Sequence, residues 1–356
     1  IYQSLSFRET MQIYQPAEDS FLLQKHVRRY VTGRVLDIGT GSGIQAITAM
    51  EHPQVREVVA VDLNKRAVNA LQKLISEKKL KKINVIHGDL FENVQGQFNL
   101  VIFNPPYLPQ DKGISDKAIY GGKKGWEISE RFFKEVSSYL FPEGIILFLF
   151  SSLTNQQKIN EILAENLLQW EEIGSEKLSF EELYVYKISK TALLRRLEGK
   201  HLTNICYFAQ GKRGNVYTAG FDRSKLIKTH LSKKEIITVA VKVRREESKS
   251  EDAISSEVLW LKELNRHSIG PRLLFYEDDY VVYEFAEGKY IEEWLPKASK
   301  EAIKSVLIEV LEQCFILDQL KVNKEEMHHP LKHVIIDEKN VPTLIDFERS
   351  YKTEKP

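Results

Sequence analysis

Phe98-Asn99-Leu100-Val101-Ile102 leads directly into Phe103-Asn104-Pro105-Pro106-Tyr107, and this junction decides the fold. The first five residues are mostly apolar and predict a buried strand. Two consecutive prolines cannot donate ladder hydrogen bonds, so the strand has to end in a rigid, extended turn. Open α/β sheets bind their ligands beyond the carboxyl ends of their strands. The turn therefore predicts a binding site.

The groups that this turn carries suit a planar –NH2 group. The side-chain oxygen of Asn104 and the carbonyl oxygen of Pro105 are both acceptors, so together they can hold its two hydrogens. This leaves the nitrogen lone pair free for a methyl donor on the far side, and Tyr107 supplies a flat wall. Catalysis would then rest on positioning and electrostatics, with no covalent intermediate. The alternative is an ordinary Pro-Pro loop, and the upstream sequence favours the binding site.

Composition excludes several classes of protein. The chain has 356 residues, a length that suggests two domains. Its net charge of +1 gives no reason to expect DNA or an anionic membrane as a partner. Cys206 and Cys314 rule out a disulfide framework and a multi-cysteine zinc site, and they fit a reducing, cytoplasmic setting. No apolar run reaches membrane-span length and no signal peptide is visible; the first residue is Ile, so the natural start is left open.

Upstream of the turn, strands and helices alternate around a glycine-rich loop. A strand that ends at Gly39 leads into a helix over 44–50, with Gly41 and Gly43 between them. Glycines let the backbone turn sharply and let a ligand approach closely. The next strand ends at Asp62, roughly twenty residues further on, where a carboxylate can accept both ribose hydroxyls of a nucleoside. This arrangement predicts a nucleoside-containing cofactor.

Two further segments fit the same site. A third strand, 83–87, leads to Asp89 and Leu90, which can accept from an adenine amino group and donate a backbone N–H. For Asp89 the alternative is a plain turn residue. A helix is expected to begin at Pro16, with acidic residues in its first turn, and to lie over the cofactor.

Taken together, these elements resemble the class I methyltransferases that use S-adenosylmethionine. Their motifs are GxGxG, an acid after the second strand, Asp after the third and [Asn/Asp]-Pro-Pro-[Tyr/Phe/Trp] after the fourth. Two segments are similar to one branch of the HemK-type family: Tyr14-Gln15-Pro16-Ala17-Glu18-Asp19-Ser20-Phe21-Leu22-Leu23 and Tyr120-Gly121-Gly122-Lys123-Lys124-Gly125. That branch, found in archaea and eukaryotes, methylates the glutamine amide in the Gly-Gly-Gln loop of translation release factors. The resemblance covers about residues 10 to 190.

The resemblance also implies site residues and a partner. The residues that would contact S-adenosylmethionine are Ser20, Asp37, Gly39, Gly41, Gly43, Asp62, Asp89 and Leu90. Those that would hold the glutamine amide are Asn104, Pro105, Pro106 and Tyr107. In this branch a small zinc-binding adaptor pairs with an exposed sheet edge, which would be strand 83–87 here, and such edge pairing is chemically sound.

After residue 200 the pattern changes to short strands. Gly211 and Gly214 lie between two apparent strands, Lys242 ends the strand sequence Val-Ala-Val-Lys, and Glu257 lies on a helix. Near the end stands Asp346, followed by Phe and Glu. This order resembles the amino lobe of a small, atypical protein kinase, in which such residues cover the phosphates, form an ion pair and bind magnesium. The resemblance implies ATP and Mg²⁺ as ligands of the second domain.

The catalytic loop departs from the kinase pattern. Where an Asp base and a downstream Asn are expected, the sequence reads Met327-His328-His329-Pro330-Leu331-Lys332-His333. Two alternatives stay open: His328 or Lys332 takes an unusual role, or the domain binds without transferring phosphate. The histidines are not expected to bind a metal, because no further ligands cluster near them.

The sequence thus predicts an α/β fold followed by an α+β domain. The expected parts are a class I S-adenosylmethionine-dependent methyltransferase with a Rossmann-like, seven-stranded sheet (1–190), a linker (191–200) and a kinase-like domain (201–356). The first is expected to methylate the release-factor glutamine. The alternatives are a DNA adenine methyltransferase, whose exocyclic –NH2 fits the same turn, a protein-lysine methyltransferase, and a non-catalytic scaffold. The neutral charge argues against DNA.

Overall fold

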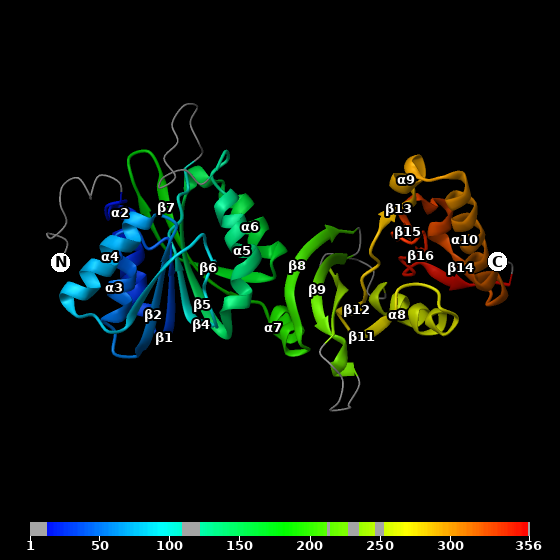
Figure 1. The fold of residues 1–356 in the computed structure, drawn as a ribbon, viewed down its shortest axis with the longest axis horizontal. Helices are drawn as coiled ribbons and strands as arrows, with labels where there is room; N and C mark the ends of the chain where they lie inside the picture. The colour runs from blue at the N-terminus through cyan, green and yellow to red at the C-terminus, as the bar shows by residue number, and fades with distance from the viewer. Residues whose placement is uncertain (1–12, 109–121, 212–213, 227–234, 246–252, 355–356) are drawn as a thin grey trace. The chain divides into compact units, whose positions relative to one another are not determined.

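The computed structural model describes residues 13–108, 122–211, 214–226, 235–245 and 253–354, and the chain divides into two compact units, Ile1–Lys200 and His201–Pro356 (Figure 1). The residues expected to link the domains form a helix, α7 (Ala192–Gly199), which groups with the first unit. A buried ion pair attaches this helix. The ammonium of Lys190 is fully buried and lies 2.7 Å from both carboxylate oxygens of Glu198.

A seven-stranded sheet forms the centre of the first unit, as the sequence predicts. Its spatial order is β3-β2-β1-β4-β5-β7-β6, with β7 antiparallel to its two neighbours and the other pairs parallel. The strands are β1 (Gly33–Ile38), β2 (Val55–Asp62), β3 (Ile83–His87), β4 (Phe98–Phe103), β5 (Leu140–Ser151), β6 (Leu168–Lys177) and β7 (Glu182–Lys190). The strand expected at 83–87 is an edge strand, and the turn at Asn104 follows β4 directly.

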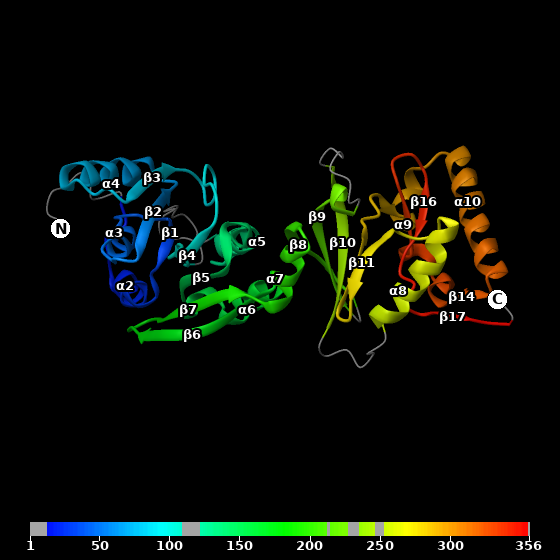
Figure 2. The same ribbon diagram turned by 90° about the horizontal axis from the view of Figure 1, so that it is seen from below.

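Helices cover both faces of this sheet (Figures 1 and 2). They are α2 (Glu18–Tyr30), α3 (Ile44–Met50), α4 (Lys65–Lys78), α5 (Glu127–Glu135) and α6 (Gln156–Glu165). Apolar residues of α2, α3 and α4 share one buried cluster with the strands. On the other face, Phe132 of α5 stacks on Phe103, and Phe133 meets Phe148 edge to face. Such aromatic pairs contribute beyond the burial of apolar area. Pro16 precedes α2 rather than opening it, because the helix begins at Glu18 after Ala17.

The parallel register brings four strand ends together. Ile38 lies opposite both Val61 and Phe103, and Asp62 lies opposite His87. The loops that follow β1, β2, β3 and β4 therefore meet at one edge of the sheet, which is where open α/β sheets bind ligands.

The second unit contains a five-stranded antiparallel sheet in the order β11-β12-β10-β9-β8. Helix α8 (Ala253–Leu264) separates the third strand from the fourth, and α10 (Lys300–Gln319) follows the sheet in sequence. The strands of the large sheet are β8 (Leu202–Gln210), β9 (Gly214–Asp222), β10 (Ile236–Arg244), β11 (Leu273–Glu277) and β12 (Tyr280–Glu284). One smaller sheet contains β13 (Lys289–Tyr290), β15 (Val334–Ile336) and β16 (Pro342–Leu344). Another pairs β14 (Val322–Lys324) with β17 (Ser350–Lys352). Within the described ranges, no helix is both long and apolar enough to cross a bilayer.

Candidate functional site

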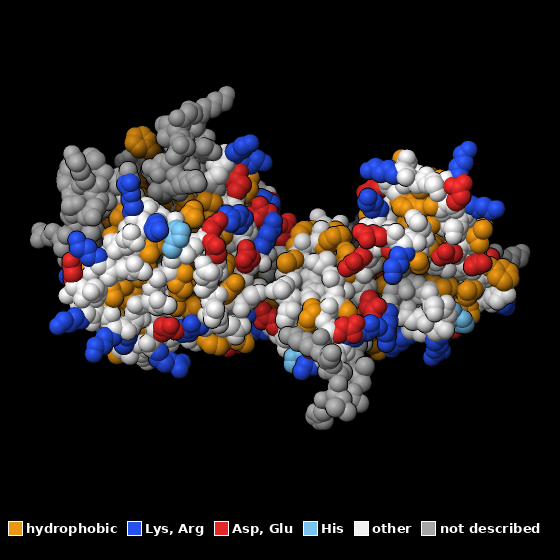
Figure 3. Space-filling view, viewed as in Figure 1, with side chains coloured by type: hydrophobic (Ala, Val, Ile, Leu, Met, Phe, Trp, Pro, Cys, Tyr) orange, Lys and Arg blue, Asp and Glu red, His pale blue; other side chains and the backbone are white. Residues whose placement is uncertain are grey.

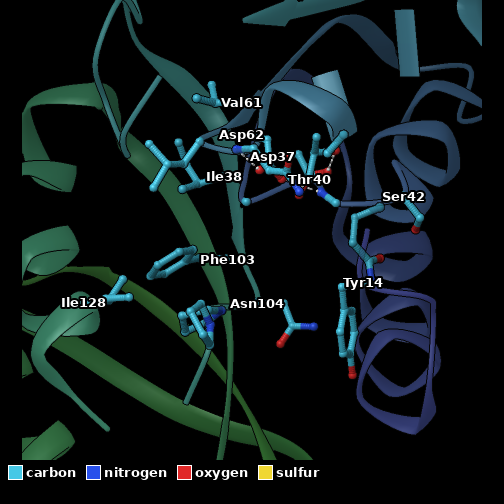
Figure 4. Close-up of a pocket in the computed structure, with 18 of the residues that line it drawn as sticks. Tyr14, Asp37, Ile38, Thr40, Ser42, Val61, Asp62, Phe103, Asn104 and Ile128 are labelled. Carbon is cyan, nitrogen blue, oxygen red and sulfur yellow. Dashed lines mark hydrogen bonds between the residues drawn. The ribbon is translucent and has the colours of Figure 1, made fainter. Parts of the chain in front are cut away.

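A cavity of about 720 Å³ opens at the carboxyl ends of β1 to β4 (Figure 4). The predicted residues that line it are Ser20, Asp37, Gly39, Gly41, Asp62, Asp89, Leu90, Asn104, Pro105, Pro106 and Tyr107. Gly43 is not among the lining residues. Gly43 has φ of +82°, a conformation that glycine adopts readily, and a Cβ built on it would displace the end of the Leu71 side chain of α4. The loop expected at 120–125 lies partly outside the described residues.

The turn after β4 presents a buried acceptor to this cavity. The Nδ2 group of Asn104 donates to Oδ2 of Asp19 at 2.8 Å. Its Oδ1 atom is buried and has no hydrogen-bond partner among the described residues. A buried carbonyl oxygen without a partner costs about 1–3 kcal/mol, so a ligand that donates to it is stabilised. The turn is also fixed from behind, because the hydroxyl of Thr154 donates to the backbone carbonyl of Tyr107 at 3.1 Å.

A second buried acceptor comes from α3. The Nε2 group of Gln45 donates to the backbone carbonyl of Ser20 at 2.9 Å, and its Oε1 atom is buried with no partner among the described residues. Gln45 is 4 % exposed and lines the cavity. No sequence pattern pointed to this residue, because glutamine at a helix start has no fixed role.

Asp37 lies at the end of β1, below the glycine-rich loop. Its Oδ2 atom accepts from the hydroxyl of Thr40 at 2.6 Å and from the backbone N–H of Ala46 at 3.1 Å. Burial raises the pKa of this carboxyl to about 7, although the two hydrogen bonds act in the opposite direction. Asp37 therefore ties the loop to the start of α3, with a charge that depends on pH.

Asp62 holds the loop from the neighbouring strand. Its two oxygens accept from the backbone N–H groups of Gly41 at 2.8 Å and Asn64 at 2.7 Å. Burial raises its pKa, and these hydrogen bonds oppose the rise. Each carboxylate oxygen has a second lone pair, so Asp62 can still accept from ligand hydroxyls.

The backbone leaves room for a ligand at Gly39. This residue has φ of +68°, a left-handed conformation that glycine adopts readily, and a Cβ built on it would meet no atom within 4 Å. The space beside it belongs to the cavity that it lines. Only glycine keeps that space open while allowing the turn.

The far end of the cavity is formed by the loop after β3. Asp89 pairs with Arg131 of α5, with 2.8 Å between the carboxylate and the guanidinium. Leu90 is buried and has φ of +51°, an uncommon conformation for a residue with a Cβ. This strain sets the direction of the backbone at the place where an adenine was expected to bind.

Two tyrosines stand near Asp19 at the other end. Burial raises the pKa of Tyr107 well above its ordinary value, and nearby Asp19 and Glu181 add to the rise. Burial and Asp19 likewise raise the pKa of Tyr14. Both hydroxyls therefore remain protonated and neutral at physiological pH. They make a flat, uncharged wall beside Asn104.

In the second unit, charged side chains converge on Lys242 of β10. Its ammonium lies 2.7 Å from Glu257 of α8, 3.0 Å from Asp346 and 3.0 Å from Glu348. Burial disfavours the charged ammonium, but the three carboxylates outweigh this effect and raise the pKa of Lys242. The three acidic residues offer oxygens within 4.8 Å of one another, and Lys242 is the cation among them.

The other residues singled out in this unit lie in two loops. Gly211 and Gly214 close the turn between β8 and β9, with the N–H of Gly211 donating to the carbonyl of Gly214 at 2.8 Å. His328 Nδ1 lies 2.7 Å from the carbonyl oxygen of Glu325. The sequence did not favour His333, yet its Nδ1 atom lies 3.7 Å from a carboxylate oxygen of Asp346.

Comparison with known proteins identifies the family to which the first unit belongs. Residues 17–179 match the family model described as methyltransferase small domain. A putative protein N5-glutamine methyltransferase of Methanocaldococcus jannaschii is 40% identical over 182 residues, which are 49% of this chain and 90% of that protein. The human methyltransferase HEMK2 is 28% identical over 194 residues, covering 50% of this chain and 90% of its own length.

A release factor glutamine methyltransferase of Deinococcus radiodurans is 31% identical over 135 residues, 35% of this chain and 48% of that one. The solved structures include the E. cuniculi Mtq2-Trm112 complex, which is described as responsible for methylation of the eRF1 translation termination factor. Its matching chain is 27% identical to this protein, and the match covers 51% of this chain and 100% of that chain with a TM-score of 0.41. The high coverage of the M. jannaschii protein decides the assignment. The chain belongs, through its first unit, to the HemK-type family of protein N5-glutamine methyltransferases.

Proposed function

We propose that the first unit transfers a methyl group from S-adenosylmethionine to the glutamine side-chain amide in the Gly-Gly-Gln loop of a translation release factor. The amide nitrogen would gain the methyl group as the S–CH3 bond breaks and would give up one proton to solvent, and the sulfonium would leave as a neutral thioether. The observation that carries this proposal is the buried Asn104 Oδ1, which lines the cavity without a hydrogen-bond partner among the described residues. The substrate class is supported by a relative named for release factor glutamine methylation.

The residues of the cavity fit the cofactor that the methyltransferase family implies. When bound, S-adenosylmethionine supplies an electrophilic methyl group on a positively charged sulfur. Asp62 would accept from the ribose hydroxyls, and Asp89 and Leu90 would hold the adenine edge. Ser20, Asp37 and the loop that contains Gly39 and Gly41 would bind the methionine portion. The open space beside Gly39 and the unpartnered Gln45 Oε1 support this fit.

The turn after β4 binds and orients the acceptor. Asn104 Oδ1 and the carbonyl oxygen of Pro105 each accept one hydrogen of the amide nitrogen, which fixes the nitrogen in the plane of the two acceptors. Pro106 makes the turn rigid, and Tyr107 covers the amide plane and excludes water. Holding the two reactants in line lowers the entropic part of the barrier.

A small zinc-binding adaptor completes the proposed assembly. The edge strand β3 has only β2 as a neighbour in its sheet, so it presents backbone groups on its outer side. A strand of a partner protein can pair with these groups. The adaptor is therefore expected to dock on β3, close to the loop that contains Asp89.

The test is a methyl-transfer assay with labelled S-adenosylmethionine and three substrates: a release factor, the same factor with the Gly-Gly-Gln glutamine replaced, and duplex DNA. Each is assayed with and without the adaptor. Label in the intact factor alone supports the proposal, and a requirement for the adaptor supports docking on β3. Label in the altered factor points to a lysine, and label in DNA to adenine; either result refutes the substrate. Acidic and basic side chains are interspersed over the face shown in Figure 3, which gives duplex DNA little to bind there.

For the second unit we propose a kinase-like module that binds ATP with Mg²⁺. A specific observation favours it: the lysine of the third strand pairs with the glutamate of the helix that follows, the ion pair on which protein kinases depend. Gly211 and Gly214 would cover the phosphates and Asp346 would bind the metal. Calorimetric titration with ATP and Mg²⁺ should detect binding that is lost in Lys242→Ala and Asp346→Ala. Binding that both variants retain would refute the site.

A further inference from the structure

Asp19, in the first turn of α2, is placed to control which end of the Asn104 amide faces the cavity. The two residues are separated by 85 positions in sequence, yet Asn104 Nδ2 lies 2.8 Å from Asp19 Oδ2. Asp19 is only 4 % exposed. Asp19 belongs to the segment that carries the family resemblance, but that resemblance gives it no part in the reaction.

The chemistry of the pair allows one orientation. An ionised carboxylate only accepts hydrogen bonds, so it selects the –NH2 end of the Asn104 amide. The carbonyl end must then face the cavity, where Oδ1 is buried and without a partner among the described residues. Had the amide been reversed, the cavity would hold a donor, which would repel the hydrogens of an acceptor –NH2 group.

Asp19 is itself held in place. Its Oδ1 atom accepts from the backbone N–H of Ser20 at 2.6 Å and from the Ser20 hydroxyl at 3.2 Å. Its charge also acts on the Tyr14 side chain, whose pKa it helps to raise. Since Oδ1 is engaged by Ser20, Oδ2 is the atom left to accept from Asn104.

We infer that Asp19 is a positioning residue for methyl transfer, which fixes Asn104 so that its carbonyl oxygen accepts from the substrate amide. This inference rests on the proposed function, because it explains how the same acceptor is presented to the glutamine. Asp19 also lines the cavity, but in this role it acts through Asn104.

The isosteric substitution Asp19→Asn tests this role in the full chain. The carbonyl of the new amide would keep the bond from the Ser20 N–H, so its –NH2 group would face Asn104 and reverse the Asn104 amide. We expect kcat to fall about 100-fold, the effect of losing one preorganised hydrogen bond to the reacting group. The Kd for S-adenosylmethionine should stay within about twofold. The matched control is Glu18→Gln, which removes an exposed neighbouring charge and should change kcat by no more than about twofold.

The reciprocal exchange separates positioning from general support of the fold. In the double variant Asp19→Asn with Asn104→Asp, the amide at position 19 donates to one oxygen of the carboxylate at position 104, and the other oxygen faces the acceptor amide. The kcat of the double variant should recover at least about tenfold over either single variant, because the hydrogen bonds are restored with their polarity reversed. In the double variant the side chains at positions 19 and 104 again form a hydrogen bond with each other. The test therefore stands even if a single substitution lowers stability.

Three results would overturn the inference: unchanged kcat in Asp19→Asn, a double variant no better than the single ones, or a loss of cofactor affinity that parallels the loss of kcat. A substrate-free readout keeps it distinct from the proposed function. The side-chain –NH2 resonances of Asn104, observed by nitrogen-15 NMR in the full chain, should shift on Asp19→Asn and not on Glu18→Gln. Unshifted resonances would refute the positioning role even if the release factor proved not to be the substrate.

Discussion

The two candidate sites differ in the groups that they present to a ligand. In the first unit, Asn104 Oδ1 and Gln45 Oε1 are buried at the cavity with no hydrogen-bond partner among the described residues. In the second unit, Lys242 has three carboxylates within 3.0 Å, so its charge is already satisfied. The first site is therefore complete only with a ligand, whereas a ligand of the second must compete with Glu348 and Asp346 for the lysine. The first site thus offers unpartnered acceptors to a ligand, whereas the lysine of the second site is already paired with three carboxylates.

The largest expected effect lies in the second unit. Lys242→Ala would leave Glu257, which is 1 % exposed, without its cation in the protein interior. Removing one partner of a buried ion pair costs about 3–5 kcal/mol, so the free energy of unfolding of this unit should fall by that amount. Denaturant unfolding followed by circular dichroism measures the change. Lys262→Ala is the control, because Lys262 is bound to an exposed tyrosine, Tyr276, on the surface. Equal stability of the two variants would contradict a structural role for Lys242 and its three carboxylate partners.

The next effect concerns the unpartnered acceptor of the first unit. Asn104→Ala removes Oδ1 and should lower kcat about 100- to 1,000-fold, equivalent to roughly 3–4 kcal/mol of transition-state stabilisation. Cofactor affinity should remain within about twofold, since Asn104 is expected to contact the acceptor. Steady-state kinetics with calorimetric measurement of Kd tests both statements. Gln157→Ala, an exposed change on α6, provides the control; equal turnover by Asn104→Ala and this control would refute the role of the turn.

A smaller effect is expected at the ribose end of the same cavity. Asp62→Asn keeps the shape of the side chain but removes its charge and replaces one acceptor by a donor. Hydrogen bonds to a charged group contribute about 1.5–3 kcal/mol, so the Kd for S-adenosylmethionine should rise at least about tenfold. Isothermal titration of both proteins gives the ratio. If the Kd were unchanged, the ribose would have to lie elsewhere in the cavity.

The smallest effect is a pH dependence at Asp37. Burial raises its folded-state pKa to about 7, while an unfolded chain ionises near 3.8. Between these pH values the folded state therefore binds more protons than the unfolded state. The protonated Asp37 stabilises the folded state at low pH, and this stabilisation is lost as pH rises through 7. Between pH 6 and pH 8 the free energy of unfolding should fall by about 1.4 kcal/mol on this account. Asp37→Asn should remove that slope in urea unfolding; an identical slope in the variant would show that other groups cause it.

Local pattern was enough to predict most of the elements that carry the first site. Helix α3 and strand β3 have the limits that the sequence indicated, because apolar runs there are bounded by glycine or by charged residues. Helices α5 and α7 were not expected, since both are short and α5 is largely polar. Their apolar residues become recognisable only once they pack against the sheet and its flanking strands.

The contacts that complete each site were beyond a sequence pattern. The Asp19–Asn104 hydrogen bond joins segments 85 residues apart, and Gln45 carries no motif. In the second unit the strand lysine and its helix partner follow from the order of elements, but the approach of Glu348 to Lys242 does not. Such contacts depend on how the elements pack against one another in the folded chain. The spacing of residues along the sequence does not reveal that packing.

The most direct test of the account is mass-spectrometric mapping of the methyl group on a release factor after incubation with this protein, S-adenosylmethionine and the adaptor. The account predicts one added methyl group on the side-chain nitrogen of the Gly-Gly-Gln glutamine, and a methylation rate at least about 100-fold lower when the Asn104→Ala variant replaces the natural protein. A methyl group on a lysine, or an unmodified factor in the presence of bound cofactor, would contradict it.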